Sequence, residues 1–205
     1  FRERYPKVTS DLRVNDTMSD LIEEGMDVAI RIGSPEDSRL IARRLGPNKA
    51  GAFASPAYLA KRGVPHRIED LEEHDCVNVR HFSSGQLLRW PFKAGTRTVE
   101  ILPVAGVIVD NTEAVAVAVA GGAGIGLSPT YVAAPYVARG ELVPVLMQYW
   151  ADRHSITALW SESRRGNPNV KAFVAFLQEI FTDPAPWDQV HMQNCLSEEQ
   201  SEMQQ

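Results

Sequence analysis

A strand–helix–strand pattern in the first 32 residues constrains the fold more than any other feature of this sequence. Residues 8–14 alternate apolar and polar side chains, which predicts a half-exposed strand. A helix is expected from Asp16 or Thr17, its candidate N-caps, to a stop at Gly25. The short apolar run 27–32 predicts a strand buried in a parallel sheet. This order of elements is a βαβ unit, and it predicts an α/β fold.

Strands and helices continue to alternate along the rest of the chain. Apolar runs bounded by turn residues predict strands at residues 40–45, 50–54, 76–79, 104–109, 125–127, 142–146 and 156–159, and a hairpin over 88–102. Capping residues and apolar periodicity predict helices at residues 57–62, 111–120 and 169–181, a helical turn at 68–73, and loop and helix over 129–139. Residues 1–5 are expected to form the last turn of a helix that ends at Pro6.

Size and composition indicate a globular protein with a sizeable core. The chain has 205 residues, of which 44% are hydrophobic and 23% are charged, enough for one large domain or two small ones. Its longest apolar run, residues 114–120, is too short to cross a membrane. The formal net charge of −5 makes this chain by itself a poor DNA-binding protein, because DNA binding needs a basic surface.

The glycine-rich stretch 121–126 predicts a tight turn rather than a nucleotide site. A dinucleotide-binding fingerprint that starts at Gly122 would need glycine at position 127, which is leucine. The stretch also follows a predicted helix and leads into a strand, whereas nucleotide binding uses the opposite order. Close packing of helix and strand backbones is the interpretation that we favour.

No residue pattern points to an enzyme, a metal or a cofactor. The five histidines lack the i, i+4 spacing of a metal site on a helix. Acid, base and hydroxyl side chains are neighbours at residues 152–155, but adjacent residues do not face one another, and the sequence has no GxSxG motif. Cys76 and Cys195 form no CxxC pair, and we expect two free thiols rather than a disulfide.

Several segments of the chain form a set that is characteristic of one family. They are residues 1–8, 20–33 (DLIEEGMDVAIRIG), 40–46, 54–59, 120–129 (AGGAGIGLSP), 140–146 and 168–177. In this order and spacing they closely resemble the effector-binding (regulatory) domain of LysR-type bacterial transcriptional regulators, over about residues 1–182. The family commonly has a Leu-Pro pair where this chain has Ser128–Pro129, and the residues after Asp183 lie outside the family pattern.

The resemblance implies two Rossmann-like α/β lobes of the type-2 periplasmic-binding-protein fold, joined by two crossover strands. Lobe I would comprise residues 1–54 and 160–183, with its first strand upstream of this chain, and lobe II would comprise residues 55–159. From composition alone, residues 184–205, rich in Pro and then in Glu and Gln, are expected to form a mobile tail or an ordered appendage. A small-molecule effector would bind between the lobes and modulate DNA binding by an N-terminal winged helix-turn-helix that this chain lacks. The start at Phe1, without methionine, leads us to expect a fragment.

The resemblance also implies a homodimer or tetramer. The expected free thiols indicate the cytoplasm, and the short apolar runs indicate no membrane association. A predicted helix over residues 18–24 offers Met18, Leu21 and Ile22 as a contact surface, although these side chains could simply cover the sheet. The alternative function is a periplasmic solute-binding protein of an uptake transporter, which has the same fold and needs an export signal. An enzyme on a related fold is a third alternative.

Candidate effector contacts follow from a rule of doubly wound sheets, in which ligands bind at the carboxyl ends of strands. The residues at these positions match the cleft-lining loops of the family: Arg31, Gly33, Ser34, Ser55, Pro56, His81, Phe82, Asn111, Thr112, Ser128 and Pro129. Arginine and the backbone N–H groups at helix N-termini favour anions, so we expect a small carboxylate-bearing metabolite. Ordinary roles are the alternative for each residue: a surface ion pair for Arg31, and helix caps for Ser55, Asn111 and Thr112.

Overall fold

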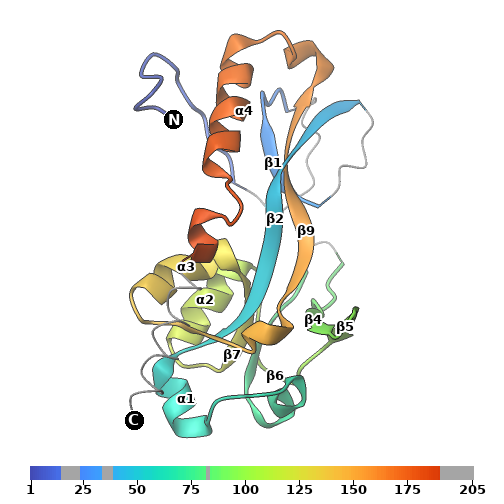
Figure 1. Ribbon diagram of the computed structural model, residues 1–205, viewed down its shortest axis with the longest axis vertical. Helices are drawn as coiled ribbons and strands as arrows, with labels where there is room; N and C mark the ends of the chain where they lie inside the picture. The colour runs from blue at the N-terminus through green and yellow to red at the C-terminus, as the bar shows by residue number, and fades with distance from the viewer. Residues whose placement is uncertain (15–23, 34–38, 82–83, 190–205) are drawn as a thin grey trace. The chain divides into compact units, whose positions relative to one another are not determined.

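Two compact units make up the computed structural model, which describes residues 1–14, 24–33, 39–81 and 84–189, the side chains of residues 152 and 153 excepted (Figure 1). Unit 1 contains residues 1–48 and 154–186, and unit 2 contains residues 49–153 together with the last described residues, 187–189. Strands β2 (Leu40–Ala54) and β9 (Ala151–Ser161) each run from one unit into the other. The units divide within these strands at Asn48 and His154, whereas the sequence analysis expects division near residues 54 and 160.

Unit 1 combines β1 (Ala29–Ile32), its neighbour β9, the first part of β2, the short 3-10 helix η3 (Glu162–Arg164) and helix α4 (Pro168–Ile180). The prediction of α4 is confirmed. Asn167 caps this helix by accepting a hydrogen bond of 2.9 Å from the Asn169 N–H. Val170, Val174 and Leu177 are buried, and their helical spacing places them on one face of α4.

Two strand predictions in unit 1 are wrong. Residues 8–14 form no strand, and Leu12 and Val14 are 85% and 87% exposed. β1 forms where a strand is expected, but it pairs antiparallel with β9 and leaves Ile30 and Ile32 nearly half exposed. Both differences have one cause: an apolar or alternating segment becomes a buried strand only where a partner strand and a covering layer lie beside it. The described residues therefore contain no βαβ unit over 8–32, and the predicted helix over 16–25 lies mostly outside them.

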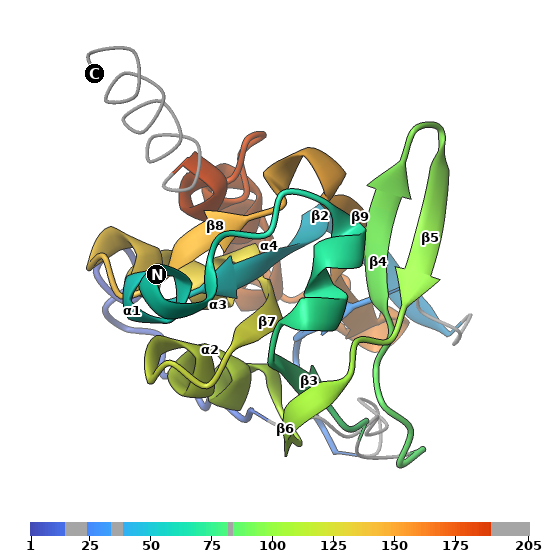
Figure 2. The same cartoon turned by 90° about the horizontal axis from the view of Figure 1, so that it is seen from below.

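Unit 2 is built around the parallel strands β7 (Ile125–Pro129), β3 (Cys76–Val79) and β6 (Ala105–Val109), which lie in that order. The end of β2 runs antiparallel to β7, and β8 (Val143–Val145) pairs antiparallel with β2. Helix α2 (Thr112–Ala120) connects β6 to β7, and α3 (Thr130–Ala138) follows β7 (Figure 2). Parallel strands connected by a helix confirm the predicted α/β class.

The predicted hairpin of unit 2 is also confirmed. Strands β4 (Trp90–Ala94) and β5 (Arg97–Ile101) pair antiparallel and project from the unit in Figure 2. Trp90 and Phe92 of β4 are buried in one apolar cluster with Leu71. The other elements of this unit are α1 (Pro56–Arg62) and two 3-10 helices, η1 (Ile68–Glu73) and η2 (Met147–Tyr149).

The glycine-rich turn packs helix and strand backbones closely, as the sequence predicts. Gly122 and Gly124 have positive φ angles of 86° and 141°, a region that favours glycine. A Cβ on Gly124 would overlap the carbonyl oxygen of Asp75, and one on Gly126 would lie 2.6 Å from Val115 and Val119 of α2. Helix α2 therefore lies directly against β7.

Candidate functional site

Three loops of unit 2 meet at the carboxyl edge of its parallel strands. β3 pairs with β6, Val79 opposite Val109, and with β7, Cys76 opposite Ile125, so the three strands end at about the same level. The Arg80 N–H, just after β3, donates a hydrogen bond of 2.8 Å to the Val109 carbonyl. The residues that this edge brings together are His81, Asn111, Thr112, Ser128 and Pro129.

At the second of these loops, three local hydrogen bonds shape the start of helix α2. The Asn111 side chain accepts a bond of 2.8 Å from the Ala114 N–H, which confirms its role as N-cap. Its amide nitrogen donates to Asp110 at 2.9 Å, and the Thr112 hydroxyl donates to Glu113 at 3.3 Å. Two carboxylates already lie at the positive end of α2, and they weaken its attraction for an anionic ligand.

The third loop would offer a ligand its backbone rather than the Ser128 hydroxyl. Ser128 is buried, and its hydroxyl donates to the Pro129 carbonyl at 3.3 Å. Pro129 is the N-cap position of α3, and no described side chain caps this helix. The Thr130 hydroxyl donates to the Lys49 carbonyl at 3.4 Å, which ties the start of α3 to β2. A ligand at this point would meet Pro129 and the first turn of α3.

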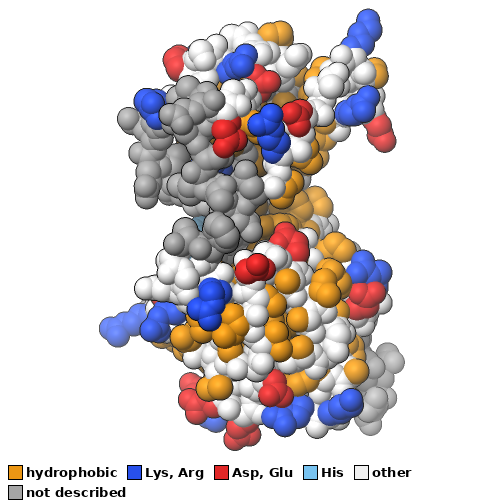
Figure 3. Space-filling model, turned by 180° about the vertical axis from the view of Figure 1, so that it is seen from behind, with side chains coloured by type: hydrophobic (Ala, Val, Ile, Leu, Met, Phe, Trp, Pro, Cys, Tyr) orange, Lys and Arg blue, Asp and Glu red, His pale blue; other side chains and the backbone are white. Residues whose placement is uncertain are grey.

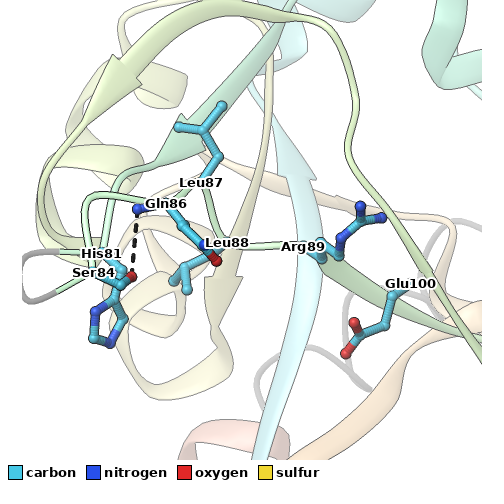
Figure 4. A pocket seen from close by; sticks show the side chains of 7 residues that line it. All are labelled: His81, Ser84, Gln86, Leu87, Leu88, Arg89 and Glu100. Carbon is cyan, nitrogen blue, oxygen red and sulfur yellow. Dashed lines mark hydrogen bonds between the residues drawn. The ribbon is translucent and has the colours of Figure 1, made fainter.

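A shallow depression of about 250 Å³ opens beside the first loop (Figure 4). Figure 4 shows His81 and Ser84 at one end and Arg89 and Glu100 at the other, and the lining is completed by Gln86, Leu87 and Leu88. Two bonds of 2.8 Å shape the loop, from the His81 N–H to the Gln86 carbonyl and from the Gly85 N–H to the His81 carbonyl. The Arg80 guanidinium donates to the Gly85 carbonyl, also at 2.8 Å.

Sequence reasoning missed most of this lining. The sequence identified only His81, which follows the predicted strand 76–79, where loops carry ligand contacts. Arg89 and Glu100 were not identifiable, because they approach each other only through the fold of the hairpin.

Ser55 and Pro56 lie at the opposite edge of the sheet from the other candidates. In the β2–β7 pair, Ala54 lies opposite Ile125 and Ala50 opposite Pro129, so Ser55 follows β2 at the amino end of β7. Ser55 is buried and accepts a bond of 3.3 Å from the Tyr58 N–H as the N-cap of α1. The expectation that this loop joins the others is wrong, because the crossover strand runs antiparallel to the strands that carry them.

The remaining candidates belong to unit 1 or lie outside the described residues. Arg31 is a half-buried residue of β1. Gly33 has a φ of 114°, and its N–H donates to the Ser155 carbonyl at 2.9 Å. Ser34 and Phe82 lie outside the described residues. For all of these residues, effector contact stays a prediction.

A second group of polar side chains lies at the amino edge of unit 2. The Tyr58 hydroxyl lies 3.2 Å from Nδ1 of His74 and accepts a bond of 2.9 Å from the Asp75 N–H. Burial lowers the pKa of His74, with a smaller contribution from Arg62, and burial raises the pKa of Tyr58. These bonds hold α1 against the segment before β3, which is a structural role.

Neither metal binding nor thiol chemistry is indicated within the part of the chain that the structure describes. No cluster of three or more His, Cys, Asp or Glu side chains there could hold a metal ion. Cys76 is a buried free thiol, and burial raises its pKa to about 12, which suppresses the reactive thiolate. No described helix is long and apolar enough to cross a bilayer.

Comparison with known proteins covers most of the chain. The model of the LysR substrate binding domain family matches residues 1–182. The HTH-type transcriptional repressor PA14_22550 of Pseudomonas aeruginosa is 30% identical over 183 residues, which are 89% of this chain and 58% of the repressor. This chain therefore spans less than two thirds of the length of that relative.

Solved structures of the same family share the fold. The regulatory domain of CrgA, a LysR-type transcriptional regulator from Neisseria meningitidis, matches with a TM-score of 0.76 and 28% identity over 88% of both chains. Full-length AphB, a virulence activator of Vibrio cholerae, matches with a TM-score of 0.73 and 26% identity over 88% of this chain and 61% of AphB. These matches confirm the predicted type-2 periplasmic-binding-protein-like fold, and the matched proteins are transcriptional regulators rather than transporter components. The chain belongs to the LysR substrate-binding domain family.

Proposed function

We propose that this chain is the ligand-sensing part of a transcriptional regulator and that its effector binds at the carboxyl edge of unit 2. The observation that supports this most directly is the meeting of the loops after β3, β6 and β7. Such an edge presents strand ends and helix starts, whose backbone groups are available to ligands. An open depression of about 250 Å³ lies beside His81 at this edge.

A small carboxylic acid is the ligand class that we propose. Arg80, His81 and Arg89 lie in or beside the depression and supply cationic or donor groups for a carboxylate. Asp110 and Glu113 at the start of α2 would repel a second acidic group. A monocarboxylate with a neutral polar end therefore fits this edge better than a dicarboxylate.

A screen of organic acids, amino acids and their neutral amides, read by thermal shift, tests the proposal. We expect Asn111→Ala and Ser55→Ala each to lower the melting temperature by a few degrees, because each removes a helix cap worth about 1 kcal/mol. Only Asn111→Ala should also weaken the response to acids, because Ser55 lies at the opposite edge. Ser55→Ala is thus a matched control for the loss of a cap.

Two results would contradict the proposed ligand site. One is a response to neutral compounds with none to acids. The other is an acid response that both cap variants weaken equally, which would place binding away from the loop at Asn111.

Regulation of transcription by the whole protein is part of the proposal. We propose that DNA is bound by an N-terminal winged helix-turn-helix outside this chain, that effector binding alters how that domain meets its operator, and that the protein acts in the cytoplasm. The genomic sequence upstream of Phe1 tests this. An in-frame winged helix-turn-helix is expected, and an export signal directly before residue 1 would contradict it.

The proposal also includes a homodimer or tetramer. Strand β6 is the last strand in the order of the sheet. Exposed apolar side chains lie on β6, just before it and on α2: Val104, Val107, Ile108 and Val117. Figure 3 shows apolar side chains on one face of unit 2. Exposed apolar edges favour pairing with another chain. Light scattering should therefore find an oligomer that Ile108→Glu shifts toward monomer, and a monomeric native chain would contradict this.

A further inference from the structure

Shortly after the segment that matches the family, the chain enters unit 2 again, at Trp187. The match ends at residue 182, and the chain passes from unit 1 to unit 2 once more between Pro186 and Trp187. Residues 186–189 form a helical turn, drawn in red beside α3 in Figure 1. In the described part of the segment for which the sequence analysis expects a tail, 184–189, Ala185 and Asp188 are buried.

Two side chains anchor this turn to unit 2. The Trp187 ring meets Tyr131 of α3 edge to face, with ring centroids 6.3 Å apart. The Asp188 carboxylate forms an ion pair of 3.1 Å with the Lys49 ammonium group. Asp188 is only 5% exposed, which is unusual for a carboxylate and requires a partner.

The anchor lies at the edge of the sheet where we propose that ligands bind. Lys49 comes directly before Ala50, which pairs with Pro129 at the carboxyl end of β7. The Lys49 carbonyl accepts the hydrogen bond of the Thr130 hydroxyl, and Thr130 is the first residue of α3. Asp188 therefore places a carboxylate next to the ammonium group of the residue whose carbonyl binds the start of α3.

The contact satisfies the Asp188 carboxylate only in part. One oxygen pairs with Lys49, but among the described residues no donor reaches the other oxygen, although it is buried. A buried carboxylate oxygen without a partner opposes burial, because it has lost its hydrogen bonds to water. A free carboxylate with full access to Lys49 and the start of α3 could therefore compete with this internal one.

We propose that Lys49 and the first turn of α3 form an acid-binding position, and that the chain's own Asp188 occupies it as an internal competitor. An external carboxylate must then displace residues 187–188 before it binds there. The inference rests on the proposed function in one respect, the use of this edge by acidic ligands. The apparent dissociation constant rises as the fraction of chains with an open position falls.

Calorimetric titration of the full chain with propionate, and with propionamide as the neutral probe, tests this. If Asp188 occupies the position in about nine-tenths of the chains, Asp188→Asn should tighten propionate binding about tenfold. The control Asp183→Asn changes an exposed carboxylate of the same segment and should leave binding unchanged. Added to Asp188→Asn, Lys49→Met should remove this gain in affinity, and propionamide should bind none of these proteins.

Trp187→Ala provides a second variant, because it removes the ring anchor and keeps the carboxylate. It should also tighten propionate binding. In chains labelled with 5-fluorotryptophan, propionate should shift the fluorine resonance of Trp187, assigned with Trp187→Phe, toward its position in Asp188→Asn.

The inference is overturned if Asp188→Asn lowers the melting temperature but leaves propionate binding unchanged, since the contact would then be purely structural. Absence of propionate binding in every variant also overturns it. Loss of binding in Asn111→Ala with no effect of Asp188→Asn would leave the proposed function standing and remove this inference. Tighter binding in Asp188→Asn with no effect of Asn111→Ala would support this inference and contradict the proposed ligand site at Asn111.

Discussion

At the scale of single residues, glycines set how closely the elements of unit 2 approach one another. Gly124 and Gly140 both have positive φ, but only Gly124 lies against another backbone, that of Asp75. We expect Gly124→Ala to lower the free energy of unfolding by about 3 kcal/mol, from strain and overlap together. Gly140→Ala should lower it by about 1 kcal/mol, from strain alone. Chemical denaturation measures both, and equal losses would show that the close approach is unimportant.

Cys76 leads to a prediction about reactivity. Burial raises its pKa from an ordinary value of 9.0 to about 12, so the folded chain holds very little thiolate at pH 8. In a Cys195→Ser variant, iodoacetamide should label Cys76 only after unfolding, as measured by mass spectrometry. Rapid labelling of the native chain would contradict this.

The same shift predicts a dependence of stability on pH. The pKa of Cys76 is higher in the folded state than in the unfolded state. Its contribution to the free energy of unfolding is therefore complete below the unfolded pKa near 9 and is lost as pH rises toward about 12. Cys76→Ala should flatten the decline of the free energy of unfolding across that window. An unchanged decline would assign it to other groups.

The sequence predicted which residues cap helices better than it predicted which residues lie close together in space. Ser55, Asn111 and Asn167 cap helices because a cap needs only a backbone N–H two or three residues away. The side of the sheet on which Ser55 lies depends instead on the direction of β2 relative to β7. That direction is set by contacts between distant segments, which local patterns do not contain.

At the scale of elements, helix α2 contains two valines that share a helix propensity but differ in burial. Val119 is 1% exposed and lies against β7, whereas Val117 of the same helix is 60% exposed. We expect Val119→Ala to lower the free energy of unfolding by about 2 kcal/mol, through lost packing. Val117→Ala should change it by less than about 0.5 kcal/mol. Urea denaturation compares them, and similar losses would place the two side chains in similar surroundings.

Elements that carry their own stabilising signals were predictable. α4 has a cap and an apolar face, and the hairpin β4–β5 has a turn between two alternating strands. Residues 8–14 have the alternation of a strand but no partner among the described residues, so the pattern alone did not produce one. Strand predictions therefore fail first where the ladder depends on a distant segment.

At the scale of the whole molecule, the two units should differ in local stability. β3 is buried along its whole length, whereas β1 is exposed at every second residue. We expect the amides of β3 to exchange with deuterium at least about tenfold more slowly than those of β1. Exchange followed by mass spectrometry measures both segments in one experiment, and equal protection would contradict the difference.

The uninterrupted run of unit 2 from Lys49 to Arg153 has a consequence for protein engineering. Its two ends continue into β2 and β9, which are neighbours in the sheet, so the run is a natural cassette for grafting into a relative of the same fold. Such a chimera would carry the loops after β3, β6 and β7 but would leave Trp187 and Asp188 behind. The chimera should therefore have the ligand specificity of this chain. The acid concentration to which it responds should depend on the residues that the recipient protein has in place of Trp187 and Asp188.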